Sequence, residues 1–238
     1  MKKLLFALAL TALLALPALA EKPQVAPIGD YERVSCELVS VCWTWDGTYT
    51  TETCDATGGL PVWQYGPSTG IPTVDCYGNP ITNVLGTILN GSYPTNAGER
   101  AIFGGSFLVS ETCYLLELCH YYDTENSFDG GNLEVKVGST YTVVPPIGGY
   151  PDNLICDSTA YYAYCVDMQP GFTDGPTAGF VRDCFDLSAF MGQTVQIAVK
   201  FGSDSSVTYP GWYIAGVMAG SLVTAAEESN WSTIKQLY

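Results

Sequence analysis

The sequence predicts an all-β protein, an antiparallel jelly-roll sandwich of two sheets with a short C-terminal helix. Every second residue from Val195 to Phe201 is large and apolar, which is the pattern of a strand buried on one face. The chain also contains 25 Gly and 14 Pro, and few segments have the length and amphipathic pattern of a helix. A chain of 238 residues can bury one large core, so we expect one main domain.

The first twenty residues have the layout of a secretory signal peptide. Two lysines precede an apolar run from Leu4 to Leu16, and small residues lead up to a cleavage point after Ala20. The apolar run is too short to span a bilayer comfortably, and no longer one follows. We therefore expect a secreted protein without membrane insertion, whose mature chain starts with a Pro-rich extended lead-in over residues 21–35.

Residues 36–222 are expected to form the sandwich, stapled by disulfides. All nine cysteines follow the signal segment, and in an oxidising compartment they predict up to four disulfides with one thiol left over. Their irregular spacing argues against zinc. Cys113 and Cys119 cannot pair with each other, because one predicted strand holds them roughly 20 Å apart. Cys156 and Cys165 flank a tyrosine-rich segment and are placed to close a hairpin, and the other pairings remain open.

Short strands and stapled loops are expected in the first part of the sandwich, up to Tyr77, where Gly, Thr and Pro are dense. Seven strand candidates follow, with turn residues between them. They cover residues 106–110, 113–122, 132–137, 141–144, 177–185, 193–201 and 212–222. This number and spacing of strands indicates two packed sheets.

The tail over residues 223–238 has a different pattern. A capping-box sequence begins at Thr224, and Trp231, Ile234 and Leu237 recur at helical spacing. This predicts a short helix that docks its apolar side onto the sandwich. An export or attachment tag is the alternative.

Four segments of the chain occur in a family-specific order. They are GLPVWQYG at 59–66, LGTILNGSYP at 85–94, HYYDTENSFDGGNLEVKV at 120–137, and DLSAFMG with GWYIAGV within 186–217. Over roughly residues 59–221 the chain resembles the C-terminal β-sandwich modules of bacterial immune inhibitor A-type secreted metallopeptidases, which are related in fold to MAM domains. The resemblance implies a MAM-like, concanavalin-like jelly roll that acts as an accessory module. The His-Glu-x-x-His motif of the family's protease domain is absent.

The net charge of the chain limits the classes of molecule that it could bind. Asp and Glu number 24 against nine Lys and Arg, for a net charge of −15 at pH 7. Such an excess repels phosphate backbones and anionic lipids, so neither nucleic acid nor a membrane surface is expected as a partner. The acidity indicates a solvated extracellular surface. The alternative is that some of the carboxylates bind calcium.

The sequence offers little for catalysis. His120 is the only histidine and lies in the apolar run CYLLELCHYYD, which favours a strand-packed residue over a catalytic one. A carboxylate pair of the glycoside-hydrolase type is the remaining route, because six acids cluster in sequence without a distinguishing feature. They are Glu111, Glu117, Asp123, Glu125, Asp129 and Glu134.

The segment DTENSFDGG predicts a calcium site. Asp123, Glu125 and Asp129 alternate with small or polar residues ahead of a Gly-Gly turn, and Ca²⁺ prefers such hard oxygen ligands. The family resemblance supports calcium but also limits it, because Ala215 and Gly216 stand where related modules have two aspartates. An acidic turn without an ion remains the alternative.

Aromatic side chains on stapled loops are the candidate ligand-binding residues. They are Trp43, Trp45, Tyr161, Tyr162 and Tyr164. Exposed rings stack on sugars or anchor a protein partner, whereas buried rings would only fill the core.

These observations together predict a secreted, non-catalytic recognition or adhesion module that binds a glycan or protein outside the cell. Two alternatives stay open. The first is a structural subunit of an extracellular coat or filament, for which self-association through the odd cysteine is a hint. The second is a carbohydrate-active hydrolase with a carboxylate pair.

Overall fold

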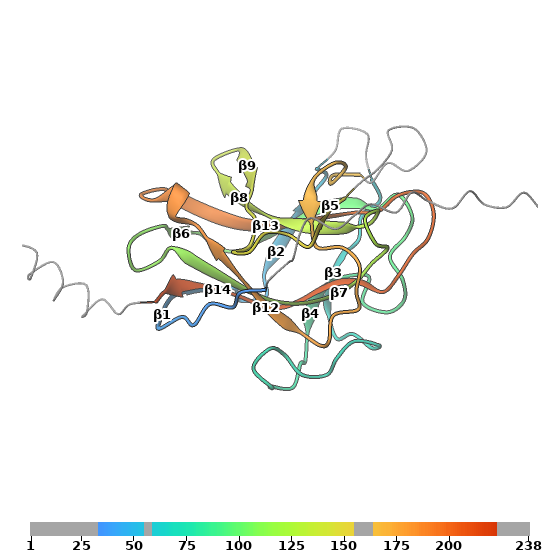
Figure 1. Cartoon of the computed structure of the whole chain (residues 1–238), viewed down its shortest axis with the longest axis horizontal. Coiled ribbons are helices and arrows are strands. Elements are labelled where there is room, and N and C mark those ends of the chain that lie inside the picture. Colours follow the sequence, from blue (N-terminus) through green and yellow to red (C-terminus); the bar gives the residue numbers. More distant parts are fainter. Residues whose placement is uncertain (1–32, 55–58, 155–163, 223–238) are drawn as a thin grey trace, which may run out of the picture.

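The computed structural model describes residues 33–54, 59–154 and 164–222, which form two facing antiparallel sheets (Figure 1). Sheet A has the order β12 (Val181–Asp186), β7 (Leu115–Asp123), β14 (Gly211–Ser221), β4 (Val84–Thr87) and β3 (Trp63–Gly66), and β1 (Ser40–Thr44) also pairs with β14. Sheet B has the order β2 (Tyr49–Glu52), β5 (Gly98–Phe103), β13 (Thr194–Gly202), β8 (Gly130–Val137) and β9 (Thr140–Val143), and β6 (Phe107–Leu108) also pairs with β13. The predicted β-sandwich is confirmed.

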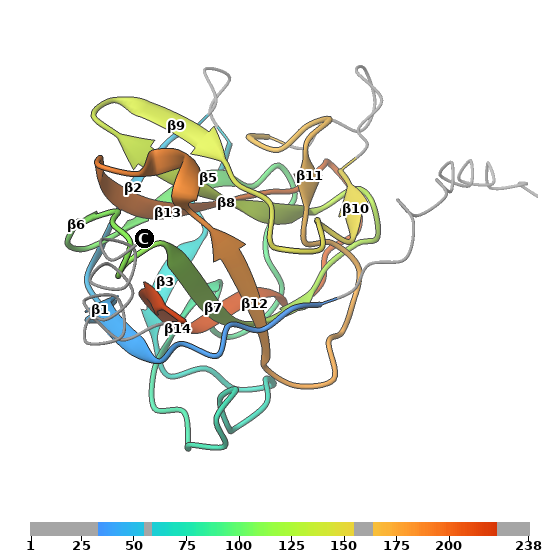
Figure 2. The same cartoon turned by 60° about the vertical axis from the view of Figure 1, so that its left-hand side comes forward.

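Two small elements complete the described structure. Strands β10 (Asp152–Asn153) and β11 (Pro170–Gly171) pair with each other, and Figure 2 shows them beside the end of the sandwich where β8 begins. A single 3₁₀ turn, η1, covers Ser188–Phe190. The predicted C-terminal helix falls within residues 223–238, outside the described residues.

The core lies between the sheets and follows the alternating pattern read from the sequence. Val195, Ile197, Val199 and Phe201 on β13 are fully buried. Trp212 on β14 fills the centre and contacts other rings of the same core cluster. Burial of each such side chain contributes about 1.5–3 kcal/mol to folding.

Strands β4 and β5 lie outside the seven strand candidates. In β5 the buried run contains Glu99 and Arg100, so the strand does not show an apolar alternation. The Glu99 carboxylate accepts hydrogen bonds from the backbone N–H groups of Val62 and Trp63, which satisfies the buried charge. In β4, Gly86 lies beneath the ring of Tyr213, where a Cβ would come within 2.5 Å of a ring carbon.

Four disulfides staple the described residues, as predicted. They are Cys36–Cys184, Cys42–Cys113, Cys54–Cys165 and Cys76–Cys119. Cys113 and Cys119 bind different partners, in agreement with the strand-spacing argument. The proposed Cys156–Cys165 hairpin is wrong, because Cys165 is bonded to Cys54, which follows β2. Cys156 itself lies outside the described residues.

Candidate functional site

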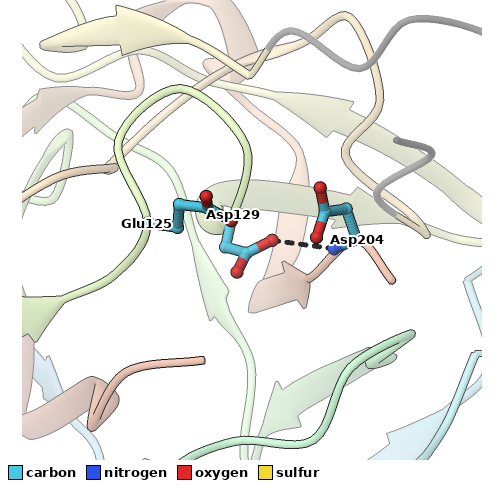
Figure 3. A group of neighbouring side chains, drawn as sticks. All are labelled: Glu125, Asp129 and Asp204. Atoms are coloured by element: carbon cyan, nitrogen blue, oxygen red, sulfur yellow. Dashed lines mark hydrogen bonds between the residues drawn. The ribbon is translucent and has the colours of Figure 1, made fainter. Parts of the chain in front are cut away.

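Three carboxylates meet at the end of the sandwich where β7 and β13 end (Figure 3). Glu125 and Asp129 belong to the β7–β8 connection, and Asp204 follows β13. One oxygen from each residue lies within 4.8 Å of the others. We call these three residues the acidic cluster.

Local backbone structure brings the first two carboxylates together. The carbonyl of Glu125 accepts hydrogen bonds from the N–H groups of Phe128 and Asp129, which closes a tight turn. Gly130 and Gly131 follow, and a Cβ on either would lie within 2.5 Å of a backbone oxygen. Only glycine allows β8 to pass this close to β11 and β13, so the Gly-Gly pair sets where Asp129 enters the sheet.

A network of hydrogen bonds holds the cluster. Asp129 Oδ1 accepts from the Asp204 N–H at 2.7 Å, and Asp129 Oδ2 accepts from the Tyr93 hydroxyl at 2.7 Å. The same hydroxyl oxygen accepts from the Glu125 N–H at 3.1 Å. Asp204 Oδ1 accepts from the N–H of Ser206. Three separate segments of the chain therefore converge on Asp129.

The cluster concentrates negative charge in a buried place. Asp129 and Asp204 have no exposed surface, and Glu125 is half-buried. Burial raises the pKa of Asp129 to about 8, and the charges of Asp204 and Glu125 add to this shift. The hydrogen bonds from Asp204 and Tyr93 oppose it. At neutral pH the buried carboxylate thus favours a neutralising proton or cation.

The ligand chemistry of the cluster fits Ca²⁺. All its side-chain ligands are carboxylate oxygens, the hard donors that Ca²⁺ prefers, and no sulfur or imidazole ligand belongs to it. A shell of roughly six to eight oxygens would need both oxygens of some carboxylates, or carbonyls and water. The cluster alone does not select Ca²⁺ over another hard cation.

The structure brings together two of the three predicted calcium ligands. Glu125 and Asp129 belong to the cluster, whereas Asp123 does not, because it lies at the end of β7. Burial raises the pKa of Asp123, and the charge of Asp174 adds to the shift. Asp204 is not among the residues that the sequence predicts, although its position two residues after the end of β13, a predicted strand, is a usable signal. Ala215 packs with Tyr121 and Tyr213 in another side-chain cluster.

The predicted aromatic site is not assembled among the described residues. Trp45 is a core residue, with its ring against Phe103 and its indole N–H donating to the Thr48 carbonyl, so the expectation of an exposed ring is wrong there. Trp43 is half-buried and packs on Phe107 at 5.3 Å between ring centroids. Tyr164 packs on a small separate apolar cluster. Tyr161 and Tyr162 lie outside the described residues.

The single histidine is sealed inside the sandwich. His120 has no exposed surface, and its Nε2 lies 2.7 Å from Asp183 Oδ2. Its Nδ1 accepts a hydrogen bond from the Trp212 indole N–H at 2.9 Å. Burial lowers the pKa of His120, although Asp183 opposes the shift. Both ring nitrogens are therefore used to join sheet A internally.

Two of the six candidate carboxylates are committed to other partners. Glu117 accepts a hydrogen bond from the Tyr77 hydroxyl on the outer side of sheet A. Glu134 binds the Arg100 guanidinium and the Lys200 ammonium on the outer side of sheet B. They therefore lie on opposite outer sides of the sandwich, in separate polar networks.

No family model matches the chain. Over 164 residues it is 28% identical to Bacillopeptidase F of Bacillus subtilis (strain 168). That alignment covers 68% of this chain but 10% of the relative, so the chain spans about a tenth of the protein that it matches. Within the described residues, no helix is long and apolar enough to cross a bilayer.

Two solved structures share a limited likeness with the chain. The glycoside hydrolase domain of Endo-D from Streptococcus pneumoniae R6 has 16% identity and a TM-score of 0.39, covering 72% of this chain and 21% of that one. The K2 cleaved adhesin domain of Lys-gingipain has 13% identity and a TM-score of 0.36, covering 74% and 89%. TM-scores this low do not establish a shared fold.

Proposed function

We propose that this chain is a secreted, non-catalytic recognition module that binds a glycan or protein ligand outside the cell. The observation that carries the proposal is the extent of the similarity to Bacillopeptidase F, which takes in most of this chain but a tenth of the larger protein. That proportion is typical of a module attached to other domains. The four disulfides support an oxidising, extracellular setting.

The absence of catalysis is part of the proposal and has its own support. His120 is the one histidine of the chain, and Asp183 and Trp212 occupy both of its nitrogens in the core. A general base must reach a substrate proton, directly or through one water. A fully buried imidazole that already bonds to two neighbours is poorly suited to that role.

Calcium binding at the acidic cluster is the second part of the proposal. Glu125, Asp129 and Asp204 would hold the ion, and its charge would compensate their mutual repulsion. Bound Ca²⁺ would fix the β7–β8 loop against the segment after β13. The ion would therefore order the loops that face a ligand, with no part in a reaction.

Binding without turnover tests this function. The mature protein, produced by export so that its disulfides form, is applied to glycan and extracellular-protein arrays with Ca²⁺ and with chelator. The same preparation is assayed for hydrolysis of peptides and polysaccharides. We expect saturable retention of one ligand class and no turnover, and a reduced, alkylated sample should lose retention.

Two results would contradict the proposal. Turnover that disappears in Glu117→Gln or Glu134→Gln while the variant stays folded would establish a hydrolase instead. Concentration-dependent assembly in light scattering, reversed by reductant and without any retained ligand, would favour a structural subunit of a coat or filament.

A further inference from the structure

A cavity of about 290 Å³ shares the β7–β8 loop with the acidic cluster. Its wall includes Tyr122 from β7, Asn126 from that loop, Asp152 from β10, and Thr173 and Asp174 from the β11–β12 connection. The Thr173 hydroxyl donates to the Glu125 carbonyl, so the wall is tied to the turn that carries the cluster. The wall of the cavity is therefore held in place by hydrogen bonds to the ordered loop at this end of the sandwich.

Within the part of the chain that the structure describes, the carboxylate of Asp152 in the cavity wall has no basic side chain paired with it. Asp152 is only 7% exposed, and its two oxygens accept hydrogen bonds from the Ser127 hydroxyl and the Asn153 N–H, both of which are neutral donors. Among the described residues, none of the ion pairs involves Asp152. Burying a carboxylate without an opposite charge is costly, so this position favours an incoming cation.

The rim adds a second negative charge. The Asp174 side chain is exposed at the mouth of the cavity, and its charge contributes to the raised pKa of nearby Asp123, after burial. Among the described residues of the wall Arg33 alone is basic, and its guanidinium pairs with Asp183 at 3.1 Å and also donates to the Tyr122 hydroxyl. The charge of Arg33 is therefore balanced inside the sandwich, and the cavity keeps an excess of negative charge.

We propose that this cavity receives the basic side chain of an extracellular polypeptide, with Asp152 as the inner acceptor and Asp174 as the acceptor at the rim. Ammonium and guanidinium groups donate short, charge-assisted hydrogen bonds to carboxylates. The rings of Pro151 and Pro176 in the wall offer apolar contact to the methylene groups of such a side chain. The site rests on the proposed recognition function and specifies a protein ligand with an exposed lysine or arginine.

The test uses two peptides that differ only in the cation. Acetyl-Gly-Lys-Gly-amide and its norleucine counterpart are titrated into the ¹⁵N-labelled mature protein. We expect saturable shifts of the Asn126, Asp152 and Thr173 amides with the lysine peptide and none with norleucine. Asp152→Asn and Asp174→Asn should each weaken binding about tenfold or more, the size expected for a charge-assisted hydrogen bond.

Glu111→Gln is the matched control. It removes one exposed carboxylate just before β7 begins, roughly 25–30 Å from the cavity at the far end of that strand. If the site is specific, the Glu111→Gln variant binds the lysine peptide with the same affinity as the native protein. Asp152 is buried, so Asp152→Asn could lower the melting temperature. Asp174 is exposed, so Asp174→Asn tests the site without disturbing the fold.

Several outcomes would overturn the site. Equal weakening by Glu111→Gln would reduce the effect to general electrostatic attraction, and no shift at millimolar peptide would remove it. Shifts with glucosamine but not with the lysine peptide would reassign the cavity to an amino sugar. Direct Ca²⁺ binding that Asp152→Asn abolishes would make it a metal site. A protein that retains an array ligand but ignores the peptide loses only this inference and keeps the proposed function.

Discussion

The two sheets are held by different means. On sheet A, disulfides connect Cys36 to β12 and Cys76 to β7, and a third joins β1 to the segment before β7. On sheet B, a group of charged side chains occupies the equivalent outward positions, and one disulfide ties the segment after β2 to Cys165. The chain therefore braces one sheet mainly by covalent bonds and the other mainly by ion pairs.

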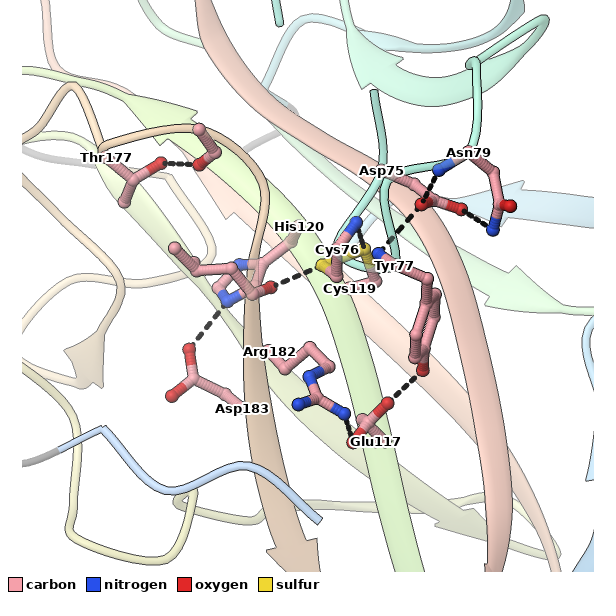
Figure 4. The surroundings of a disulfide bond; sticks show 12 residues. Asp75, Cys76, Tyr77, Asn79, Glu117, Cys119, His120, Thr177, Arg182 and Asp183 are labelled. Atoms are coloured by element: carbon pink, nitrogen blue, oxygen red, sulfur yellow. Dashed lines mark hydrogen bonds and ion pairs between the residues drawn. A yellow bond between two sulfur atoms is a disulfide. The ribbon is translucent and has the colours of Figure 1, made fainter. Parts of the chain in front are cut away.

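The disulfides of sheet A also position polar side chains. Figure 4 shows Cys76 bonded to Cys119 of β7, with Asp75 shaping the turn that leads to Asn79. This turn carries the Tyr77 hydroxyl onto Glu117, a carboxylate that is only 2% exposed. The disulfide thus fixes a loop that in turn covers a buried charge on sheet A.

The ionic side depends on matched partners. Glu134 on β8 is 3% exposed and lies 2.7 Å from the Lys200 Nζ of β13 and 2.5 Å from the Arg100 Nε of β5. Arg100 also pairs with Glu52 of β2 at 3.0 Å, and its guanidinium lies over the Tyr141 ring. The network joins side chains of four neighbouring strands, β2, β5, β13 and β8, and Tyr141 adds a side chain from β9. A buried network of this kind holds only while each charge keeps its partner.

Removal of a disulfide from sheet A should cause the largest loss in the free energy of unfolding. The double variant Cys36→Ala/Cys184→Ala opens a loop closed over 148 residues, so the chain-entropy model predicts a loss of about 5 kcal/mol in the free energy of unfolding. Guanidinium unfolding of exported protein measures it. A loss below about 1 kcal/mol would break the comparison, since sheet A would then not depend on its covalent bracing.

Peptide mapping by mass spectrometry provides the control for that experiment. The native protein should give the four observed pairs, and alkylation without reduction should label Cys156, because the other eight cysteines are paired with one another. A Cys156–Cys165 peptide would contradict the connectivity on which the comparison rests.

Removal of the central carboxylate of sheet B should follow in size. Glu134→Gln keeps the shape of the side chain but leaves Lys200 and Arg100 without its charge, and breaking a buried ion pair costs about 3–5 kcal/mol. Urea unfolding measures the change. Glu111→Gln, at an exposed position, is the matched control and should stay within about 0.5 kcal/mol of the native protein. Similar values for the two variants would show that the ionic bracing contributes nothing special.

The same contrast explains what the sequence could predict. Strands such as β13 and β14 were readable because one of their faces is apolar and packs in the core. Strand β5 was not, because Arg100 looks like a loop residue from sequence alone. Only the pairing of β5 with β13, and of β13 with β8, places Lys200 and Glu134 beside it. Disulfide count followed from composition, whereas connectivity required knowledge of which distant strands are neighbours.

Only part of the acidic cluster can be read from the sequence, for the same reason. Glu125 and Asp129 lie on one loop and could be read together, but Asp204 is 75 residues further along than Asp129 and enters only through the ends of β8 and β13. Trp45 was misplaced because propensity does not distinguish a stapled surface loop from a strand neighbour whose ring fills the core.

The loops of the acidic cluster sharpen the comparison, because a cation would brace them where neither sheet does. We expect Ca²⁺ at about 100 times its dissociation constant to stabilise the protein by about 2.7 kcal/mol, measured as a higher melting temperature than in chelator. Asp204→Asn should abolish this response, because the residue belongs to the cluster, and Asp123→Asn should preserve it. The reverse result would restore the ligand set that the sequence indicated.

The smallest expected effect comes from His120, which joins β7 to β12 and β14 inside sheet A without a covalent bond. Burial lowers its pKa below the usual 6.5, so it stays neutral in the folded protein while the unfolded chain takes up a proton. Its contribution to stability is therefore complete above pH 6.5 and is lost as pH falls below that value towards the folded pKa, by at most about 1.4 kcal/mol per pH unit.

Urea unfolding at pH 7.5, 6.5 and 5.5 measures this slope in the native protein and in His120→Gln. Asp129, with its pKa raised to about 8, acts in the opposite direction over the whole of this interval, so the difference between the two proteins is the informative quantity. We expect the native protein to lose more stability than His120→Gln between pH 6.5 and 5.5. Equal slopes would mean that the imidazole accepts a proton in place, with the Asp183 carboxylate outweighing burial and the Trp212 hydrogen bond broken.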